Sequence, residues 1–166
     1  IGCEMIDMGG GLGIDYDNPL GNPIPDFQGY FSTFRNRLKM PAGTKVHFEL
    51  GRSIVAQCGD LITKVLYTKH TAHKKFAIVD AGFTDLIRPA LYGAYHDIEN
   101  ISNICTEKEA YDIVGPICES SDVFAKDRVI SPAKRGDFLA IHSAGAYGEV
   151  MASTYNSRPL IKGYLV

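Results

Sequence analysis

The chain has 166 residues, a formal net charge of -2 and a hydrophobic share of 45%, which is the composition of an ordinary globular protein. This charge leaves no polycationic face, which argues against binding of nucleic acid through bulk electrostatics. No apolar run is long enough for a transmembrane helix, and the four scattered cysteines form no CxxC pair or disulfide framework, so a cytoplasmic protein without membrane contact is expected.

The first 52 residues have the pattern of α/β structure. The apolar run CEMIDM ends at a cluster of glycines, and a proline-rich loop follows it. Aromatic residues then recur at helical spacing from Phe27 to Leu38, and TKVHFEL predicts a second strand. This order predicts a parallel βαβ unit, which cannot bury both faces of its strands alone. We therefore expect the segment to be the last piece of a larger parallel barrel whose beginning is absent.

From Ser53 onward the sequence changes to short β-type segments separated by turn signals, which predicts an antiparallel β barrel or sandwich. SIVAQCGDLITKVLYTK is interpreted as one long strand with a bulge at Gly59, paired with KKFAIVDAG. His70 and His73 lie among lysines between these two segments, which favours an exposed hairpin tip over a metal site. A short helix is expected in GAYGEVMASTY. Further strands are expected in AYDIVGPIC, RVISP, GDFLAIHSAG and RPLIKGYLV.

Glycines at positions 9, 10, 11 and 13 directly follow the first predicted strand. Glycines at such a place let backbone N–H groups approach a phosphate closely. The pattern does not fit G-x-G-x-x-G, because Ile14 breaks it, and it lacks the Lys-Ser/Thr of a P-loop. The pattern alone therefore leaves a phosphate site and a plain flexible turn both open.

Two further motifs place charged side chains beside predicted strands. In HFELGRS, Glu49 could keep a ring nitrogen protonated and Arg52 could clamp an anion, or the two could simply pair with each other. In LIRPALYGAY, Arg88 lies inside an apolar segment with Tyr92 four residues later. Such an arginine needs an anionic partner, which is either a ligand or a carboxylate of the same chain.

The last two motifs contain a cysteine and a tyrosine. In GPICESSD, Cys118 and Glu119 end a predicted strand, and a lone cysteine is usually inert filler. In SAGAYGEVMASTYN, Tyr147 has a glycine on one side and follows Gly145-Ala146 on the other, where it would either cap a ligand phosphate or pack.

The order of the five motifs is more specific than any one of them. Gly-rich loop, Glu-x-Gly-Arg, Arg-Pro-Ala-Leu-Tyr, Cys-Glu-Ser-x-Asp and Gly-Ala-Tyr together resemble the C-terminal half of the diaminopimelate decarboxylase family, which are pyridoxal-phosphate enzymes with an alanine-racemase-like barrel. The resemblance covers essentially the whole chain. It implies that residues 1–52 are the C-terminal remnant of a TIM-type, cofactor-binding (β/α)8 barrel and that residues 53–166 are the C-terminal β domain. The family usually has proline where Leu50 stands.

The resemblance also implies a reaction and roles for the motif residues. The implied cofactor is pyridoxal 5'-phosphate, and the implied reaction converts meso-2,6-diaminopimelate to L-lysine and CO2 in lysine biosynthesis. Cys118 is implied to be the catalytic proton donor, and Glu119 to meet the distal ammonium of the substrate. The residues implied to bind the cofactor are Gly9, Gly10, Gly11, Glu49, Gly51, Arg52 and Tyr147. Those implied to bind the substrate are Arg52, Arg88, Tyr92, Glu119 and Tyr147, and no metal is implied.

Two features bear on whether this chain acts alone. In the family, Cys118 and Glu119 reach into the partner subunit's site, so a homodimer is expected. The family's Schiff-base lysine lies in a Tyr-x-x-Lys-type motif near the start of the barrel, and no lysine here matches it. The chain alone is therefore expected to be inactive and to form no covalent cofactor adduct.

Two alternatives remain open. The first is an ornithine- or arginine-type decarboxylase of the same fold, which typically carries Cys-Asp-Gly-x-Asp where this chain has Cys-Glu-Ser-Ser-Asp. The second is a truncated, non-catalytic binding or regulatory relative, which only the missing lysine supports. The glutamate and the Arg-Pro-Ala-Leu-Tyr motif favour a substrate with a second carboxylate.

Overall fold

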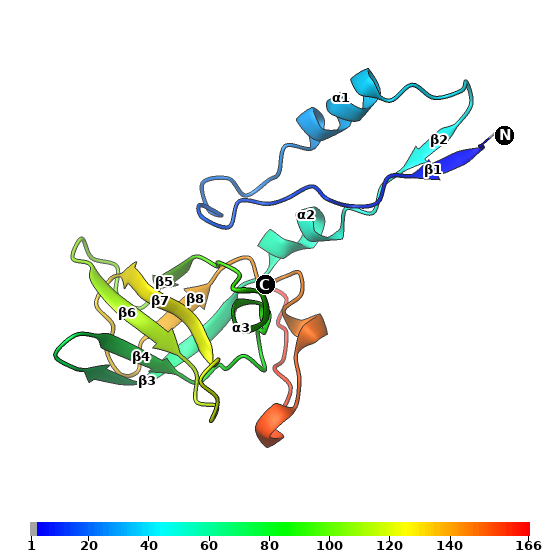
Figure 1. The fold of residues 1–166 in the computed structure, drawn as a ribbon. Coiled ribbons are helices and arrows are strands. Elements are labelled where there is room, and N and C mark those ends of the chain that lie inside the picture. Colours follow the sequence, from blue (N-terminus) through cyan, green and yellow to red (C-terminus); the bar gives the residue numbers. More distant parts are fainter. Residues whose placement is uncertain (1–2) are drawn as a thin grey trace.

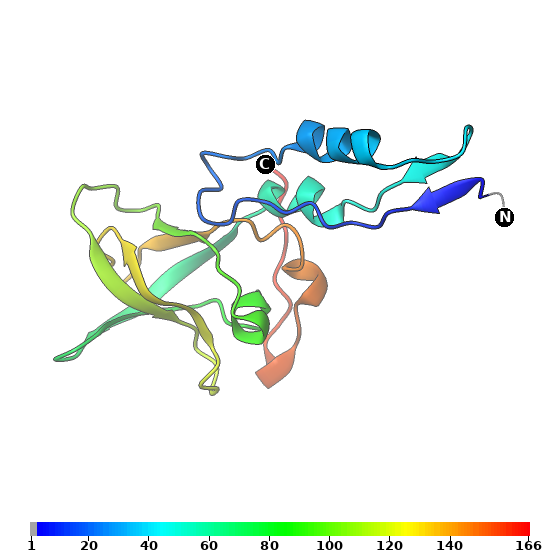
Figure 2. The same cartoon turned by 45° about the horizontal axis from the view of Figure 1, so that its top comes forward.

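The computed structural model describes residues 3–166, which form a barrel-like β domain and an elongated arm that extends from it (Figures 1 and 2). The arm contains β1 (Met5–Asp7), α1 (Phe27–Arg37) and β2 (Lys45–His47). β1 and β2 pair in parallel, with Met5 opposite Lys45, which confirms the predicted βαβ unit. No described helix is long and apolar enough to cross a membrane.

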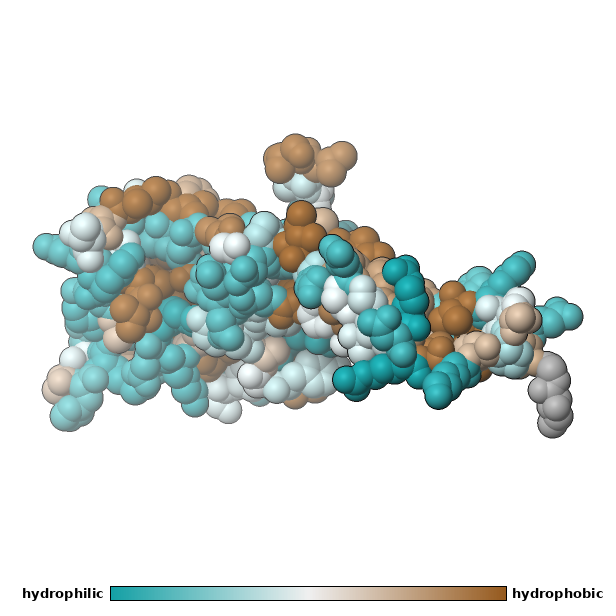
Figure 3. Space-filling view, turned by 90° about the horizontal axis from the view of Figure 1, so that it is seen from above, coloured by the Kyte–Doolittle hydropathy of each residue, from teal (hydrophilic) through white to brown (hydrophobic). Residues whose placement is uncertain are grey.

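The arm is held together by aromatic rings. Phe48, which follows β2, packs edge-on against Phe31 and Phe34 of α1, with ring centroids 5.0 Å apart in both pairs. Helix α1 begins at Asp26, whose carboxylate accepts a hydrogen bond from the Gly29 N–H. No residue of α1 is buried, and Figure 3 shows hydrophobic surface along the arm as well as along the barrel. The arm therefore has little core of its own.

Residues between the arm and the barrel are helical, so the long strand predicted from Ser53 is wrong in its first part. They form α2 (Gly51–Val55) and a 3-10 turn, η1 (Ala56–Cys58). The Ser53 hydroxyl donates to the Leu50 carbonyl at 3.1 Å, a local bond that competes with the extended strand conformation. The predicted bulge at Gly59 is also wrong. The register shifts between Val65 and Tyr67 instead.

The barrel is a six-stranded mixed sheet. Its strands are β3 (Leu61–His70), β4 (Lys75–Val79), β5 (Ile98–Asn100), β6 (Glu109–Val114), β7 (Val123–Ile130) and β8 (Phe138–Ile141). Short helical turns accompany them: α3 (Arg88–Tyr92), η2 (Glu149–Met151) and η3 (Tyr155–Ser157). The strand order is β5-β8-β3-β4-β6-β7, and the hairpin predicted between β3 and β4 is confirmed.

The sequence predicted an antiparallel sheet, and one strand pair departs from that prediction. All neighbouring pairs are antiparallel except β4 and β6, which are parallel, with Phe76 opposite Asp112. The reason is the long connection between them, because a crossover that carries α3 and β5 returns the chain to the end where β4 began. Strand β5 was not predicted. Among residues 158–166 the structure has no strand, so the strand predicted in RPLIKGYLV is wrong, while GAYGEVMASTY contains the short turn η2.

The core lies inside the barrel, and an arginine side chain bridges the place where its two edge strands meet. Val65, Val79, Ile113 and Leu139 are all fully buried there. The edge strands β5 and β7 approach each other, and Arg128 of β7 binds the segment that leads into β5. Its guanidinium donates to the Tyr95 hydroxyl and, at 3.0 Å, to the His96 carbonyl, and it lies 3.8 Å from the Asp97 carboxylate. The barrel is thus nearly closed, by an arginine rather than by a full ladder of backbone bonds.

We predict that amide hydrogens in α1 exchange with solvent at least about ten times faster than those in β3, β4 and β6. The reason is that exchange follows local opening, which is easiest where few apolar side chains are buried. Hydrogen–deuterium exchange of this chain by mass spectrometry measures it, with β4 around the fully buried Ala77 as the protected reference. Equal protection of the arm and the barrel in a dilute sample would contradict the prediction.

Candidate functional site

A small pocket of about 240 Å³ lies where the arm meets the barrel. It collects three stretches of the chain that are far apart in sequence: the glycine loop, the end of the segment after β2, and the loop after β8. Its lining consists of Gly10, Gly11, Leu12, Glu49, Leu50, Gly51, Arg52 and Tyr147. Of the residues predicted to bind a cofactor, all except Gly9 line this one pocket, and Gly9 adjoins it in sequence.

The glycine loop has a backbone that requires glycine. Gly9 and Gly11 have φ angles of 69° and 106°, which side chains rarely tolerate. A Cβ on Gly10 would lie 2.8 Å from the Glu49 carbonyl oxygen, because the Glu49 N–H donates to the Gly9 carbonyl and draws the two segments together. Within residues 3–166, no acceptor is recorded for the N–H groups of Gly10, Gly11 and Leu12. These three residues line the pocket, and their N–H groups are open to a ligand.

The opposite side of the pocket is charged and aromatic. The guanidinium of Arg52 lies 5.6 Å from the centre of the Tyr147 ring. Tyr147 lines the pocket and has a φ angle of 61°, an uncommon conformation for a non-glycine residue. The salt bridges recorded in residues 3–166 do not include one between Glu49 and Arg52, so the simple ion pair considered for this motif is not formed.

The donor set of this pocket fits a phosphorylated aromatic ring with a basic nitrogen. Open backbone N–H groups and an arginine suit a phosphate. A carboxylate such as that of Glu49, exposed at the same pocket, suits a protonated ring nitrogen. The chemistry of the residues present thus matches the cofactor implied by the sequence.

Arg88 is buried, with 7% of its surface exposed, and its partners belong to this chain. Its Nη1 donates to Nε2 of His96 at 2.8 Å, and its guanidinium lies 4.8 Å from the centre of the Tyr16 ring. The intramolecular salt bridge considered for Arg88 is not found among the described residues. Tyr92, at the other end of α3, is 64% exposed. Neither residue lines the pocket, and their predicted substrate contacts stay predictions.

His96 is neutral, and its tautomer follows from its partners. Its Nδ1 lies 2.8 Å from the His142 carbonyl oxygen, which can only accept, so Nδ1 carries the proton. Its Nε2 must then accept from Arg88, which can only donate. Burial, and next the charges of Arg88 and Arg128, lower the pKa of His96 from 6.5 to about 4. Sequence reasoning missed this role, because a lone histidine carries no signal of its own.

Cys118 and Glu119 lie on the exposed turn between β6 and β7, outside the pocket. The turn is organised by Asp122, which is 3% exposed. The Asp122 carboxylate accepts from the N–H of Ile117 and from the N–H of Phe83, both at 2.7 Å. Burial raises the pKa of Asp122, and the two N–H bonds oppose that effect. Cys118 is therefore exposed, not the buried filler considered from its sequence.

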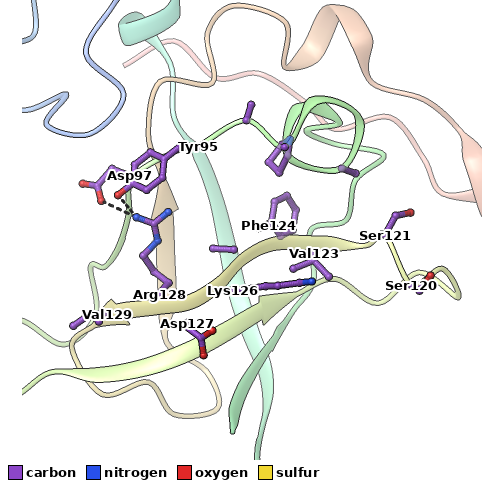
Figure 4. A pocket seen from close by; sticks show the side chains of 15 residues that line it. Tyr95, Asp97, Ser120, Ser121, Val123, Phe124, Lys126, Asp127, Arg128 and Val129 are labelled. Carbon is purple, nitrogen blue, oxygen red and sulfur yellow. Dashed lines mark hydrogen bonds and ion pairs between the residues drawn. The ribbon is translucent and has the colours of Figure 1, made fainter.

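A second groove, of about 810 Å³, lies along β7 and the segment from Pro89 to Asp97 (Figure 4). None of the predicted cofactor or substrate residues lines it. Arg128 lines this groove, and its guanidinium already binds Tyr95 and Asp97, as the dashed lines show. We therefore place the candidate site in the smaller pocket.

Comparison with known proteins adds independent information. Residues 14–145 match the family described as "Pyridoxal-dependent decarboxylase, C-terminal sheet domain". The diaminopimelate decarboxylase of Bacteroides thetaiotaomicron is 60% identical over 161 residues, which cover 97% of this chain and 42% of the relative. That of Pseudomonas aeruginosa is 51% identical, over 95% of this chain and 37% of the relative. The chain thus spans about two fifths of the length of these relatives.

Solved structures agree with this result. Diaminopimelate decarboxylase from Helicobacter pylori complexed with L-lysine has a TM-score of 0.82 and 45% identity, covering 94% of this chain and 38% of that one. Lysine/ornithine decarboxylase from Vibrio vulnificus complexed with cadaverine has a TM-score of 0.78 at 22% identity, covering 92% of this chain and 40% of that one. The second likeness is evidence for the fold alone.

We predict that His96→Gln removes part of the acid sensitivity of folding. The pKa of His96 is about 6.5 in the unfolded chain and about 4 in the folded chain. The stability contributed by the neutral ring is therefore complete above pH 6.5 and is lost as the pH falls toward 4, by about 3 kcal/mol of unfolding free energy.

Urea unfolding of the variant and the wild type at several values between pH 4 and pH 7 measures this difference. His73→Gln, at the hairpin tip between β3 and β4, is the matched control and should leave the pH dependence unchanged. Parallel curves for His96→Gln and the wild type would show that His96 binds its proton equally in both states.

Proposed function

The chain belongs to the pyridoxal-dependent decarboxylase family, and on this premise we propose that it forms the C-terminal part of a diaminopimelate decarboxylase. The proposed reaction removes one carboxylate of meso-2,6-diaminopimelate as CO2 and leaves L-lysine. The observation that carries the proposal is the pocket in which the glycine loop, Glu49, Arg52 and Tyr147 meet. The names of the relatives at 60% and 51% identity support the choice of substrate.

In this proposal the pocket holds pyridoxal 5'-phosphate. The N–H groups of Gly10 and Gly11 and the guanidinium of Arg52 bind its phosphate, Arg52 also serving the substrate carboxylate. Glu49 pairs with the ring nitrogen and keeps it protonated, and Tyr147 walls the pocket beside Arg52. When bound, the cofactor supplies a protonated ring that accepts the electron pair left by the departing CO2.

The substrate roles fall on residues outside the pocket. Arg88 and Tyr92 bind a substrate carboxylate, Glu119 binds the distal ammonium, and Cys118 delivers the proton that replaces the lost carboxylate. Cys118 and Glu119 are exposed and lie apart from the pocket of their own chain. That separation supports a homodimer in which this turn serves the partner's site. We propose a cytoplasmic location for the enzyme. The likeness to lysine/ornithine decarboxylase, at 22% identity, does not favour ornithine as the substrate.

We predict that Arg52→Ala, in the full-length protein that contains this chain, weakens binding of pyridoxal phosphate by about 10- to 100-fold. Charge-assisted hydrogen bonds to an anion contribute about 1.5–3 kcal/mol each, which corresponds to that range. Fluorescence titration of the apoprotein measures the change. Arg37→Ala, at the exposed end of α1, is the control and should bind as the wild type does. Unchanged affinity in Arg52→Ala would remove Arg52 from the cofactor site.

The proposed reaction is tested by release of CO2 and lysine from meso-2,6-diaminopimelate. We predict that Cys118→Ala lowers kcat by about 10²- to 10⁴-fold with little change in KM, because proton donation acts in the transition state. Cys58→Ala, another exposed cysteine, should keep the wild-type kcat. Turnover of ornithine or arginine instead of diaminopimelate would overturn the proposed substrate, and a wild-type kcat in Cys118→Ala would overturn the proton-donor role.

A further inference from the structure

We propose that Tyr155 is a positioning residue that holds the Glu119 carboxylate in place for recognition of the substrate's distal ammonium. The inference rests on the proposed function, in which Glu119 faces that ammonium, and it adds a residue to which the five motifs assign no role. Two observations support it: a hydrogen bond between the two side chains, and the contacts that fix the donor and the acceptor of that bond in place.

The contact is a hydrogen bond from the Tyr155 hydroxyl to Oε1 of Glu119. A carboxylate has two oxygens and accepts several hydrogen bonds, so Oε2 of Glu119 stays available for an ammonium. The same bond raises the pKa of Tyr155, because losing the hydroxyl proton would break it and place two negative charges together.

One buried carboxylate organises both partners of this contact. Asp122 accepts from the N–H of Ile117, in the turn that carries Glu119, and from the N–H of Phe83. The Phe83 ring in turn packs against the Tyr155 ring, with centroids 5.4 Å apart and a tilt of 45°. The donor and the acceptor are therefore fixed to the same point of the barrel, although 36 residues separate them in sequence.

The backbone beyond Tyr155 is strained and clamped. Asn156 and Ser157 have φ angles of 57° and 58°, and non-glycine residues in this region cost about 1 kcal/mol or more each. The chain is then held by Arg158, whose Nη2 donates to the Asp80 carbonyl at 2.6 Å and lies 3.4 Å from the carboxylate of the buried Asp85. This clamp holds the turn from which the Tyr155 hydroxyl reaches Glu119.

Positioning matters here because Glu119 is on an exposed turn. A free glutamate side chain samples many rotamers and loses that freedom when it binds an ammonium. The Tyr155 hydroxyl restricts those rotamers before the substrate arrives, so less entropy is lost on binding. Tyr155 should therefore act on amine recognition and not on the removal of CO2.

The experiment compares two substrates in the full-length protein that contains this chain. Diaminopimelate carries the distal ammonium, and 2-aminopimelate has the same skeleton and carboxylates without it. We expect Tyr155→Phe to lower kcat/KM for diaminopimelate about tenfold, through KM, while kcat/KM for 2-aminopimelate stays at the wild-type value. In a Glu119→Gln background, Tyr155→Phe should have no further effect, because it acts through the Glu119 carboxylate.

Tyr67→Phe, an exposed tyrosine on β3, is the matched control and should change neither value. Equal losses on both substrates, or additive losses in the double variant, would overturn the proposal and indicate a structural role only. If the enzyme proves to use ornithine, the proposed substrate is wrong, but the role of Tyr155 can still be tested. Ornithine and norvaline then replace the pair, because they also differ only in the distal amine.

Discussion

A neutral imidazole joins the arm of this protein to its barrel. His96 donates to a barrel carbonyl through Nδ1 and accepts from Arg88 through Nε2, and the ring of Tyr16 packs edge-on against it at 5.2 Å. Tyr16 follows the glycine loop by only three residues. Protonation of His96 would remove the hydrogen bond that its Nε2 accepts from Arg88, and so weaken one of the contacts that hold the arm against the barrel. Burial of the ring keeps it unprotonated.

The two halves of the candidate chemistry are built in different ways. The pocket side uses backbone, since glycines at positive φ let Glu49 approach the loop and leave N–H groups open. The Cys118–Glu119 side uses a side chain, the buried Asp122 carboxylate, to shape an exposed turn. A backbone cradle suits a cofactor of fixed shape, whereas an exposed turn suits a surface completed by another molecule.

The sequence predicted the elements and motifs whose signals are local. The helix from Phe27, the parallel βαβ unit, the β3–β4 hairpin and the motif order all depend on spacing or on neighbouring residues. The helical turn at Ser53 was missed because the β-branched Ile54 and Val55 favour a strand. The parallel pairing of β4 with β6 was missed because it depends on a crossover, and strand β5 because three residues give no periodicity.

The candidate site divides in the same manner. Motif order identified the glycine loop, Glu49, Arg52 and Tyr147, which the structure brings together. The roles of His96, Asp122 and Tyr155 could not be inferred, because each depends on a partner at least eight residues away or on a contact made only in the folded barrel. Residue type alone does not show which distant group a histidine, aspartate or tyrosine will meet.

The parallel β4–β6 pair has a consequence for how the molecule is divided. The hairpins β3–β4 and β6–β7 each close over a short stretch of chain, but Arg88 and His96 belong to the crossover between them. There they pair with each other, and His96 also bonds to the His142 carbonyl, which follows β8. Neither hairpin contains the junction that joins the arm to the barrel. A split of the chain within the crossover would leave each product with secondary structure but neither product with a site. We therefore expect the site and the nearly closed barrel to unfold together, as one cooperative unit.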